Sequence, residues 1–98
     1  MNMKIMGIAF NGPYNVDTTD FNSIPGVYVI SDSSFRPIDV GQTEDLRRRM
    51  SSHDRYECWA RSSTGRPLLY FYHIPNERER LELESAIRSR FPFVCGIR

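Results

Sequence analysis

The chain has 98 residues, 40% of them hydrophobic, and a formal net charge of +1 at pH 7. This length predicts one domain, spanning residues 1–98, with a single hydrophobic core. The low net charge excludes a protein that is basic over its whole surface, and the sequence has neither an apolar run of about 18 residues nor a signal-peptide layout, so we expect a cytoplasmic protein with no membrane span.

The N-terminal quarter is rich in turn-forming residues. Residues 3–10 favour a first strand, but Asn11-Gly12-Pro13 and Pro25-Gly26 interrupt the chain behind it. We therefore expect residues 1–24 to form an ordered but irregular arm.

Two short strands are expected after this arm. The stretch GVYVI, which begins at Gly26, is rich in β-branched and aromatic residues. The stretch SDSS behind it is typical of a turn, and PIDVG then ends at Gly41. These features predict a β-hairpin over residues 26–41.

Two helices and one further strand complete the pattern. A helix is predicted over residues 43–53, with Thr43 as its N-cap. The stretch LLYFYHI, residues 68–74, predicts the strongest strand, and a second helix capped by Asn76 is predicted over residues 77–91. The order β-β-α-β-α predicts an α+β fold, with a small antiparallel three-stranded sheet flanked by helices.

Each predicted helix carries charged residues beside its apolar face. On a helical wheel, Arg49 and His53 lie beside Leu46 in the first helix, and Glu84 lies within the apolar arc of the second. A buried carboxylate is costly unless it meets a cation, a metal or hydrogen-bond donors. If both helices packed on the same face of the sheet, these charged groups would meet near Tyr28. A salt bridge between Arg49 and Glu84 would explain both residues without any function.

Arginine dominates the basic residues. Twelve of the thirteen are arginines, and six of these lie between residues 47 and 66 against only two acidic residues. Guanidinium groups recognise phosphate through a planar fork. The cluster is therefore either a patch that faces phosphate or a solvated basic loop.

The two cysteines, Cys58 and Cys95, lie far apart in the sequence. They match no paired spacing of zinc ligands. We expect both to be reduced thiols with a structural role.

The spacing of these features resembles the GIY-YIG endonuclease superfamily. GVY at residues 26–28 is followed by DVG at residues 39–41, then by QTEDLRRRMSSH, and finally by a helix with a glutamate and RFPFVCG behind it. The similarity covers residues 25–96. It implies a GIY-YIG-like α+β fold and the hydrolysis of phosphodiester bonds in DNA.

The resemblance also implies roles for single residues. Tyr28 corresponds to the tyrosine of the first motif, which activates or orients the attacking water, and Arg49 to the arginine that contacts the scissile phosphate. His53 corresponds to a histidine that some members use near that phosphate. Glu84 corresponds to the carboxylate that holds a single divalent ion, Mg²⁺ or Mn²⁺. A fixed guanidinium and a metal ion both stabilise the charge that develops on phosphate, so these residue types suit the reaction.

The match departs from the family pattern in two places. The asparagine often found after the late helix is missing, with Cys95-Gly96 in that neighbourhood. Asp39 stands where the second motif has a tyrosine. An anion there repels phosphate unless it binds metal or pairs with an arginine such as Arg36. Asp39 is therefore either an altered catalytic residue, with a part in water activation or metal binding, or a solvated carboxylate at the end of a strand.

We expect a small metal-dependent DNA endonuclease with Tyr28, Asp39, Arg49 and His53 as catalytic candidates and Glu84 as the metal ligand, arranged around one open, hydrated hollow. A separate DNA-reading module does not fit into this length, so structure-directed cleavage, a homodimer or a recruiting protein would be needed. Two alternatives stay open. One is a catalytically weakened module of the same fold that binds nucleic acid or a protein partner, and the other is a purely structural domain.

Overall fold

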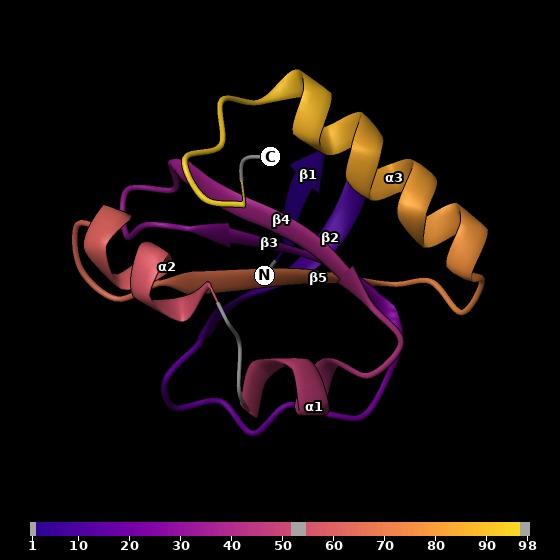
Figure 1. Ribbon diagram of the computed structural model, residues 1–98, viewed down its shortest axis with the longest axis horizontal. Helices are drawn as coiled ribbons and strands as arrows, with labels where there is room; N and C mark the ends of the chain where they lie inside the picture. The colour runs from indigo at the N-terminus through magenta and orange to yellow at the C-terminus, as the bar shows by residue number, and fades with distance from the viewer. Residues whose placement is uncertain (1, 52–54, 97–98) are drawn as a thin grey trace.

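The computed structural model describes residues 2–51 and 55–96 and shows one antiparallel sheet with helices on both faces (Figure 1). The sheet has five strands in the order β1-β2-β5-β3-β4. The strands are β1 (Asn2–Ile5), β2 (Ile8–Asn15), β3 (Gly26–Ser31), β4 (Pro37–Thr43) and β5 (Leu68–His73), and the helices are α1 (Leu46–Ser51), α2 (Tyr56–Ser62) and α3 (Glu77–Arg90). The predicted α+β architecture with an antiparallel sheet is confirmed, but the predicted number of three strands is wrong.

The two additional strands lie in the segment that was expected to be an irregular arm. Met6 and Gly7 have φ angles of 53° and 80°, which is the backbone geometry of a two-residue hairpin turn. The single strand expected over residues 3–10 therefore folds back on itself, and β2 pairs with β5. A methionine rarely adopts a positive φ, so the sequence carried no strong signal for this turn.

The predicted hairpin of β3 and β4 is present, and its register places the candidate residues. Tyr28 lies opposite Gly41, and Ile30 lies opposite Asp39. Because side chains alternate along a strand, Tyr28 and Asp39 project to one face of the sheet and Val29 to the other. β4 is an edge strand, so groups from both faces can meet around it.

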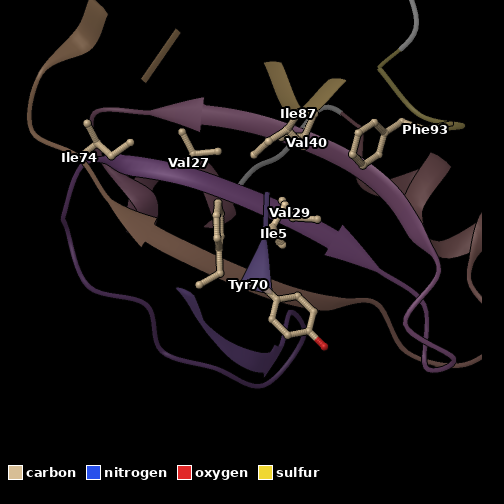
Figure 2. Packing of buried hydrophobic residues seen from close by; sticks show 9 residues of the cluster. Ile5, Val27, Val29, Val40, Tyr70, Ile74, Ile87 and Phe93 are labelled. Atoms are coloured by element: carbon tan, nitrogen blue, oxygen red, sulfur yellow. The ribbon is translucent and has the colours of Figure 1, made fainter. Parts of the chain in front are cut away.

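Helix α3 covers the face of the sheet to which the valines of β3 and β4 project. Figure 2 shows Ile87 of α3 next to Val40, with Phe93 of the following segment beside them. Apart from the hydroxyl of Tyr70 this cluster is apolar, and its burial provides the main stabilisation of α3 on the sheet.

Helices α1 and α2 cover the opposite face (Figure 1). Leu46 of α1 and Trp59 of α2 are their fully buried side chains, and both join the cluster around Tyr28 and Ile30. The two predicted helices therefore pack on opposite faces of the sheet and not on one. α2 itself was not predicted, because one buried residue makes no periodic apolar pattern.

The helix caps follow the expected chemistry, with one shift. The side chain of Asn76 accepts a hydrogen bond from the backbone N–H of Glu79 at 3.0 Å and caps α3 as predicted. In α1 the capping side chain is Asp45, which accepts from the N–H of Arg48 at 3.1 Å, rather than Thr43. Within the described ranges, no helix is long and apolar enough to cross a membrane.

Cys58 and Cys95 form a disulfide bond, with their Cα atoms 5.9 Å apart. The prediction of reduced thiols is therefore wrong. Cys58 lies on α2, whereas Cys95 lies on the segment after α3, where its N–H donates to the carbonyl of Ile38 at 3.0 Å. The spacings of metal ligands do not predict a contact between two cysteines that are 37 positions apart in the sequence.

Candidate active site at the edge of strand β4

Tyr28 lies across the neighbouring strand, with its ring over Gly41. A Cβ atom added at Gly41 would overlap the Oη and Cζ atoms of Tyr28. Glycine is therefore required at this position for close approach rather than for an unusual backbone angle. The contact brings the phenol hydroxyl to the edge of the sheet.

Arg49 of α1 meets this hydroxyl. Its Nε donates a hydrogen bond to Tyr28 Oη at 3.4 Å. Arg49 is half-buried and borders a hollow of about 400 Å³, together with Arg48 and the residues before α1. Arg47 lies elsewhere: its side chain is 63% exposed and faces Asp20 at 3.7 Å. The structure thus agrees with the helical wheel, which selected Arg49 from the three consecutive arginines.

The surroundings of Tyr28 hold it in the neutral form. Burial raises the pKa of Tyr28 above the usual value of 10.0, and the hydrogen bond from Arg49 and the charges of Arg49 and Arg55 oppose this rise only in part. The side chain is fully covered. At neutral pH the phenol is therefore protonated and covered, and it is Arg49 that borders the solvent-filled hollow.

Glu84 lies on the side of α3 that runs along β4. Arg80 Nε donates to Gln42 Oε1 at 3.0 Å, and Arg88 Nη2 donates to the carbonyl of Val40. Residues four positions apart share one side of a helix. Glu84 is midway between Arg80 and Arg88 in α3, so it lies beside the part of β4 between Val40 and Gln42. Tyr28 covers this same part of β4 from the other face.

The Glu84 side chain is half-buried and borders a second hollow, of about 300 Å³, together with Ser85, Arg88 and Ser89. The expected single hollow is therefore not observed: Arg49 and Glu84 open onto two hollows on either side of β4. Within residues 2–51 and 55–96 no ion pair joins Arg49 to Glu84, so a structural salt bridge between them does not explain these two residues.

The same overall fold occurs in the N-terminal GIY-YIG endonuclease domain of UvrC from Thermotoga maritima. A point mutant of that domain, bound to its catalytic divalent cation, matches with a TM-score of 0.63 and 21% identity over 79% of this chain and 87% of that chain. The magnesium-bound domain matches with a TM-score of 0.61 and 20% identity, over 78% and 86% of the two chains. This chain has the GIY-YIG endonuclease fold.

The fold expected from the sequence resemblance is thereby confirmed. No protein-family model and no curated protein matches the sequence. The likeness in fold therefore leaves activity to be argued from the residues at the edge of β4.

Asp39, which the sequence resemblance assigns to the second-motif position, has a side chain that is 0% exposed. Trp59 Nε1 donates to it at 2.7 Å, Arg88 Nη2 donates at 2.9 Å, and Arg55 Nε lies 3.3 Å away. Asp39 is therefore not the solvated carboxylate that the sequence allowed, and its partners do not include Arg36. A direct part in water activation would require these contacts to open.

The partners of Asp39 were not predicted from the sequence. Arg88 could be predicted from the sequence, because it lies one turn after Glu84 on the same side of α3. The helical wheel that selected Glu84 therefore selects Arg88 too. Arg55 and Trp59 gave no such signal, because the short helix α2 was not predicted. Gln42 accepts the hydrogen bond from Arg80. His53 lies outside the described residues.

The donor set at the β4 edge limits the metal that could bind. Among the residues that the structure describes, no three His, Cys, Asp or Glu side chains form a cluster. Glu84 offers an accessible carboxylate on α3, to which the described residues make no ion pair, and Glu44 and Asp45 border the hollow beside Arg49. Mg²⁺ keeps several of its waters and is often held by one or two carboxylates, whereas structural zinc needs four ligands. One accessible carboxylate together with water ligands suits Mg²⁺ or Mn²⁺.

Proposed function

We propose that this protein is a divalent-metal-dependent endonuclease of the GIY-YIG type that hydrolyses phosphodiester bonds in DNA. The observation that carries the proposal is the contact between Arg49 and Tyr28 at the part of β4 that Glu84 flanks from the other face. A cation that can bind phosphate, a phenol and an accessible carboxylate are thus combined within the fold of a nuclease domain.

Arg49 is the residue that binds the scissile phosphate. It borders the hollow beside α1, and its planar guanidinium can contact two phosphate oxygens. Negative charge grows on these oxygens as the attacking oxygen approaches phosphorus. A guanidinium already fixed in place stabilises that charge more strongly in the transition state than in the ground state.

Tyr28 orients the attacking water once DNA is bound. In the protein alone, the Tyr28 hydroxyl is covered and accepts a hydrogen bond from Arg49. Arg49 keeps this Nε contact while its Nη groups bind the phosphate, so the guanidinium stays in place. The phenol is then positioned to donate its O–H to the attacking water beside that phosphate.

Glu84 would hold the metal ion, with water molecules as the remaining ligands. When bound, such an ion stabilises negative charge on the phosphate and on the leaving oxygen. The role of Glu84 in this chain is to fix the position of the ion at the edge of β4. His53 is proposed as a further group near the phosphate on the strength of the sequence resemblance alone.

DNA is the proposed substrate, because Arg49 lies within the arginine-rich segment between residues 47 and 66. A homodimer or a recruiting protein stays a prediction. The cytoplasmic setting also stays a prediction, and the bond between Cys58 and Cys95 weighs against it, because disulfides persist mainly in oxidising surroundings.

Asp39 favours a second candidate function. With an engaged carboxylate in place of the second-motif tyrosine, the site lacks one phenol of the family pattern. A weakened site of this kind would still bind DNA through its arginines. This second candidate is a DNA-binding module that does not cleave.

Nicking of supercoiled plasmid in the presence of Mg²⁺ distinguishes the two candidates. The nuclease is expected to nick, to stop on addition of a chelator, and to lose about 10²- to 10³-fold in rate as Arg49→Ala or Glu84→Ala. Arg78→Ala and Glu82→Ala are the controls, since both side chains are exposed on α3 and lie outside the arginine-rich segment, and each should change the rate by less than about two-fold. Plasmid that is shifted in a gel but uncut supports the binding module and overturns the nuclease.

A further inference from the structure

We propose that Asp39 is a positioning residue that holds the two halves of the site in register across the edge of β4. Through Arg88 it fixes α3, which carries Glu84, and through Trp59 it fixes the ring of Tyr28 on the opposite face. The proposal rests on the nuclease function, because the register matters for catalysis only if Arg49 and Glu84 serve one reaction. The contacts that Asp39 makes are present in the protein alone.

The first half is the connection to α3. Arg88 extends from the helix around the β4 edge and donates to Asp39 Oδ1 at 2.9 Å and to the carbonyl of Cys95 at 3.2 Å. Its guanidinium also lies 5.6 Å from the centre of the Phe93 ring. These contacts leave Arg88 little freedom to move. Because Glu84 is one helical turn earlier, a displacement of Arg88 also displaces the proposed metal ligand.

The second half is the connection to Tyr28. Trp59 Nε1 donates to Asp39 Oδ2 at 2.7 Å, so the carboxylate fixes the orientation of the indole. The edge of that indole meets the ring of Tyr28 at a centroid distance of 6.2 Å and an interplanar angle of 69°. Tyr28 in turn contacts Arg49. A continuous series of contacts therefore runs from Asp39 to the proposed phosphate-binding residue.

The segment after α3 closes over the carboxylate. Gly96 adopts a φ of 72°, and a Cβ atom there would overlap Arg55 Nη1 and lie 2.8 Å from Asp39 Oδ1. The disulfide from Cys95 to Cys58 ties this segment to α2. Water is thereby kept from Asp39, and ion pairs in such an enclosed position are stronger and more rigid than ion pairs on the surface.

The same chain provides a matched control for this role. Asp32 is also a buried carboxylate paired with an arginine, and its side chain is 1% exposed. It lies in the turn between β3 and β4, and its partners are Arg36, Ser34 and Thr64, none of which touches the candidate site. Asp39→Asn and Asp32→Asn therefore make the same chemical change in the two places.

The test measures single-turnover plasmid nicking at a temperature at which both variants are fully folded. Asp39→Asn should slow the cleavage step by about ten- to a hundred-fold, because small displacements of catalytic groups have effects of this size. DNA affinity should be unchanged, and Asp32→Asn should cleave at the wild-type rate. An Asp39→Asn variant that is folded and cleaves at the wild-type rate overturns the proposal.

A second readout needs neither DNA nor metal. Trp59 is the single tryptophan of the chain, so its near-ultraviolet circular dichroism reports on the indole that Asp39 holds. Asp39→Asn should reduce this signal and Asp32→Asn should not; an unchanged signal in Asp39→Asn overturns the proposal. If Asp39→Asn does not fold, Arg88→Lys, which keeps a cation but loses the fork, should show the slower cleavage. Wild-type protein that does not cleave overturns the nuclease function, and the Trp59 signal then decides the positioning role by itself.

Discussion

Asp32 and Asp39 lie on the same hairpin and are both buried, yet they hold together different parts of the molecule. Asp32 accepts hydrogen bonds from the backbone N–H groups of Ser34 and Arg36, each at 2.9 Å, which close a local turn, and it has one distant partner, the hydroxyl of Thr64 at 3.2 Å. Asp39 accepts one local hydrogen bond, from the backbone N–H of Val40 at 2.8 Å, and its other partners come from residues 16 to 49 positions later in the chain. One carboxylate stabilises a turn, whereas the other joins the two faces of the sheet.

The solvent exposure of the partners shows the same difference. The Arg36 side chain beside Asp32 is 66% exposed, whereas those of Arg55 and Arg88 beside Asp39 are 20% and 23% exposed. Ion pairs that face water contribute little to stability, but removal of one partner from an enclosed pair leaves a charge without compensation. The chain therefore depends far more on Asp39 than on Asp32.

The largest expected effect is that of Asp39→Ala. The substitution leaves Arg55 and Arg88 without their shared anion and the Trp59 N–H without its acceptor. It should lower the free energy of unfolding by about 3–5 kcal/mol, measured by urea denaturation. A loss no greater than that of Asp32→Ala would contradict the distinction between the two carboxylates.

Reduction of the disulfide should have the next largest effect. The bond between Cys58 and Cys95 closes a loop of 37 residues, and a cross-link of this span is worth about 3–4 kcal/mol in the chain-entropy account. Dithiothreitol should lower the melting temperature of the wild type and leave that of a double Cys→Ser variant unchanged. Equal melting temperatures with and without the reductant would show that the bond does not form in solution.

The smallest effect is expected for Asp32→Asn, and it should depend on pH. The substitution weakens the local turn and should lower the free energy of unfolding by about 1–3 kcal/mol at neutral pH. Hydrogen bonds from the backbone of Arg36 and from Ser34 and Thr64, with the Arg36 charge, hold the pKa of Asp32 below its usual 3.8, although burial opposes them.

The sign of the pH effect follows from that lowered pKa. The stability that Asp32 contributes is fully present above pH 3.8 and is lost as the pH falls through the lower pKa of the folded state. The difference between wild type and Asp32→Asn should therefore shrink on acidification, as urea denaturation at several pH values would measure. A difference that grows as the pH falls would show that these hydrogen bonds are not the source of the stability that Asp32 contributes.

The same contrast explains what the sequence could predict. The hairpin over residues 26–41, the Asn76 cap and Arg49 depend on neighbours in the chain or on helical periodicity, and they were predicted. The β1–β2 turn, α2 and the disulfide depend on a rare backbone angle or on contacts between distant residues. Asp39 was noticed only because it departs from the family pattern, and its enclosed surroundings could not be derived without the fold.

The central claim is that Arg49 on one face of the sheet and Glu84 on the other serve one reaction across the edge of β4. A double-mutant cycle in single-turnover plasmid nicking with Mg²⁺ tests it most directly, because residues that act as a unit have strongly non-additive effects. Arg49→Ala combined with Glu84→Ala should be no slower than the slower single variant. Effects that multiply independently, or a Glu84→Ala variant that nicks at the wild-type rate, would contradict it.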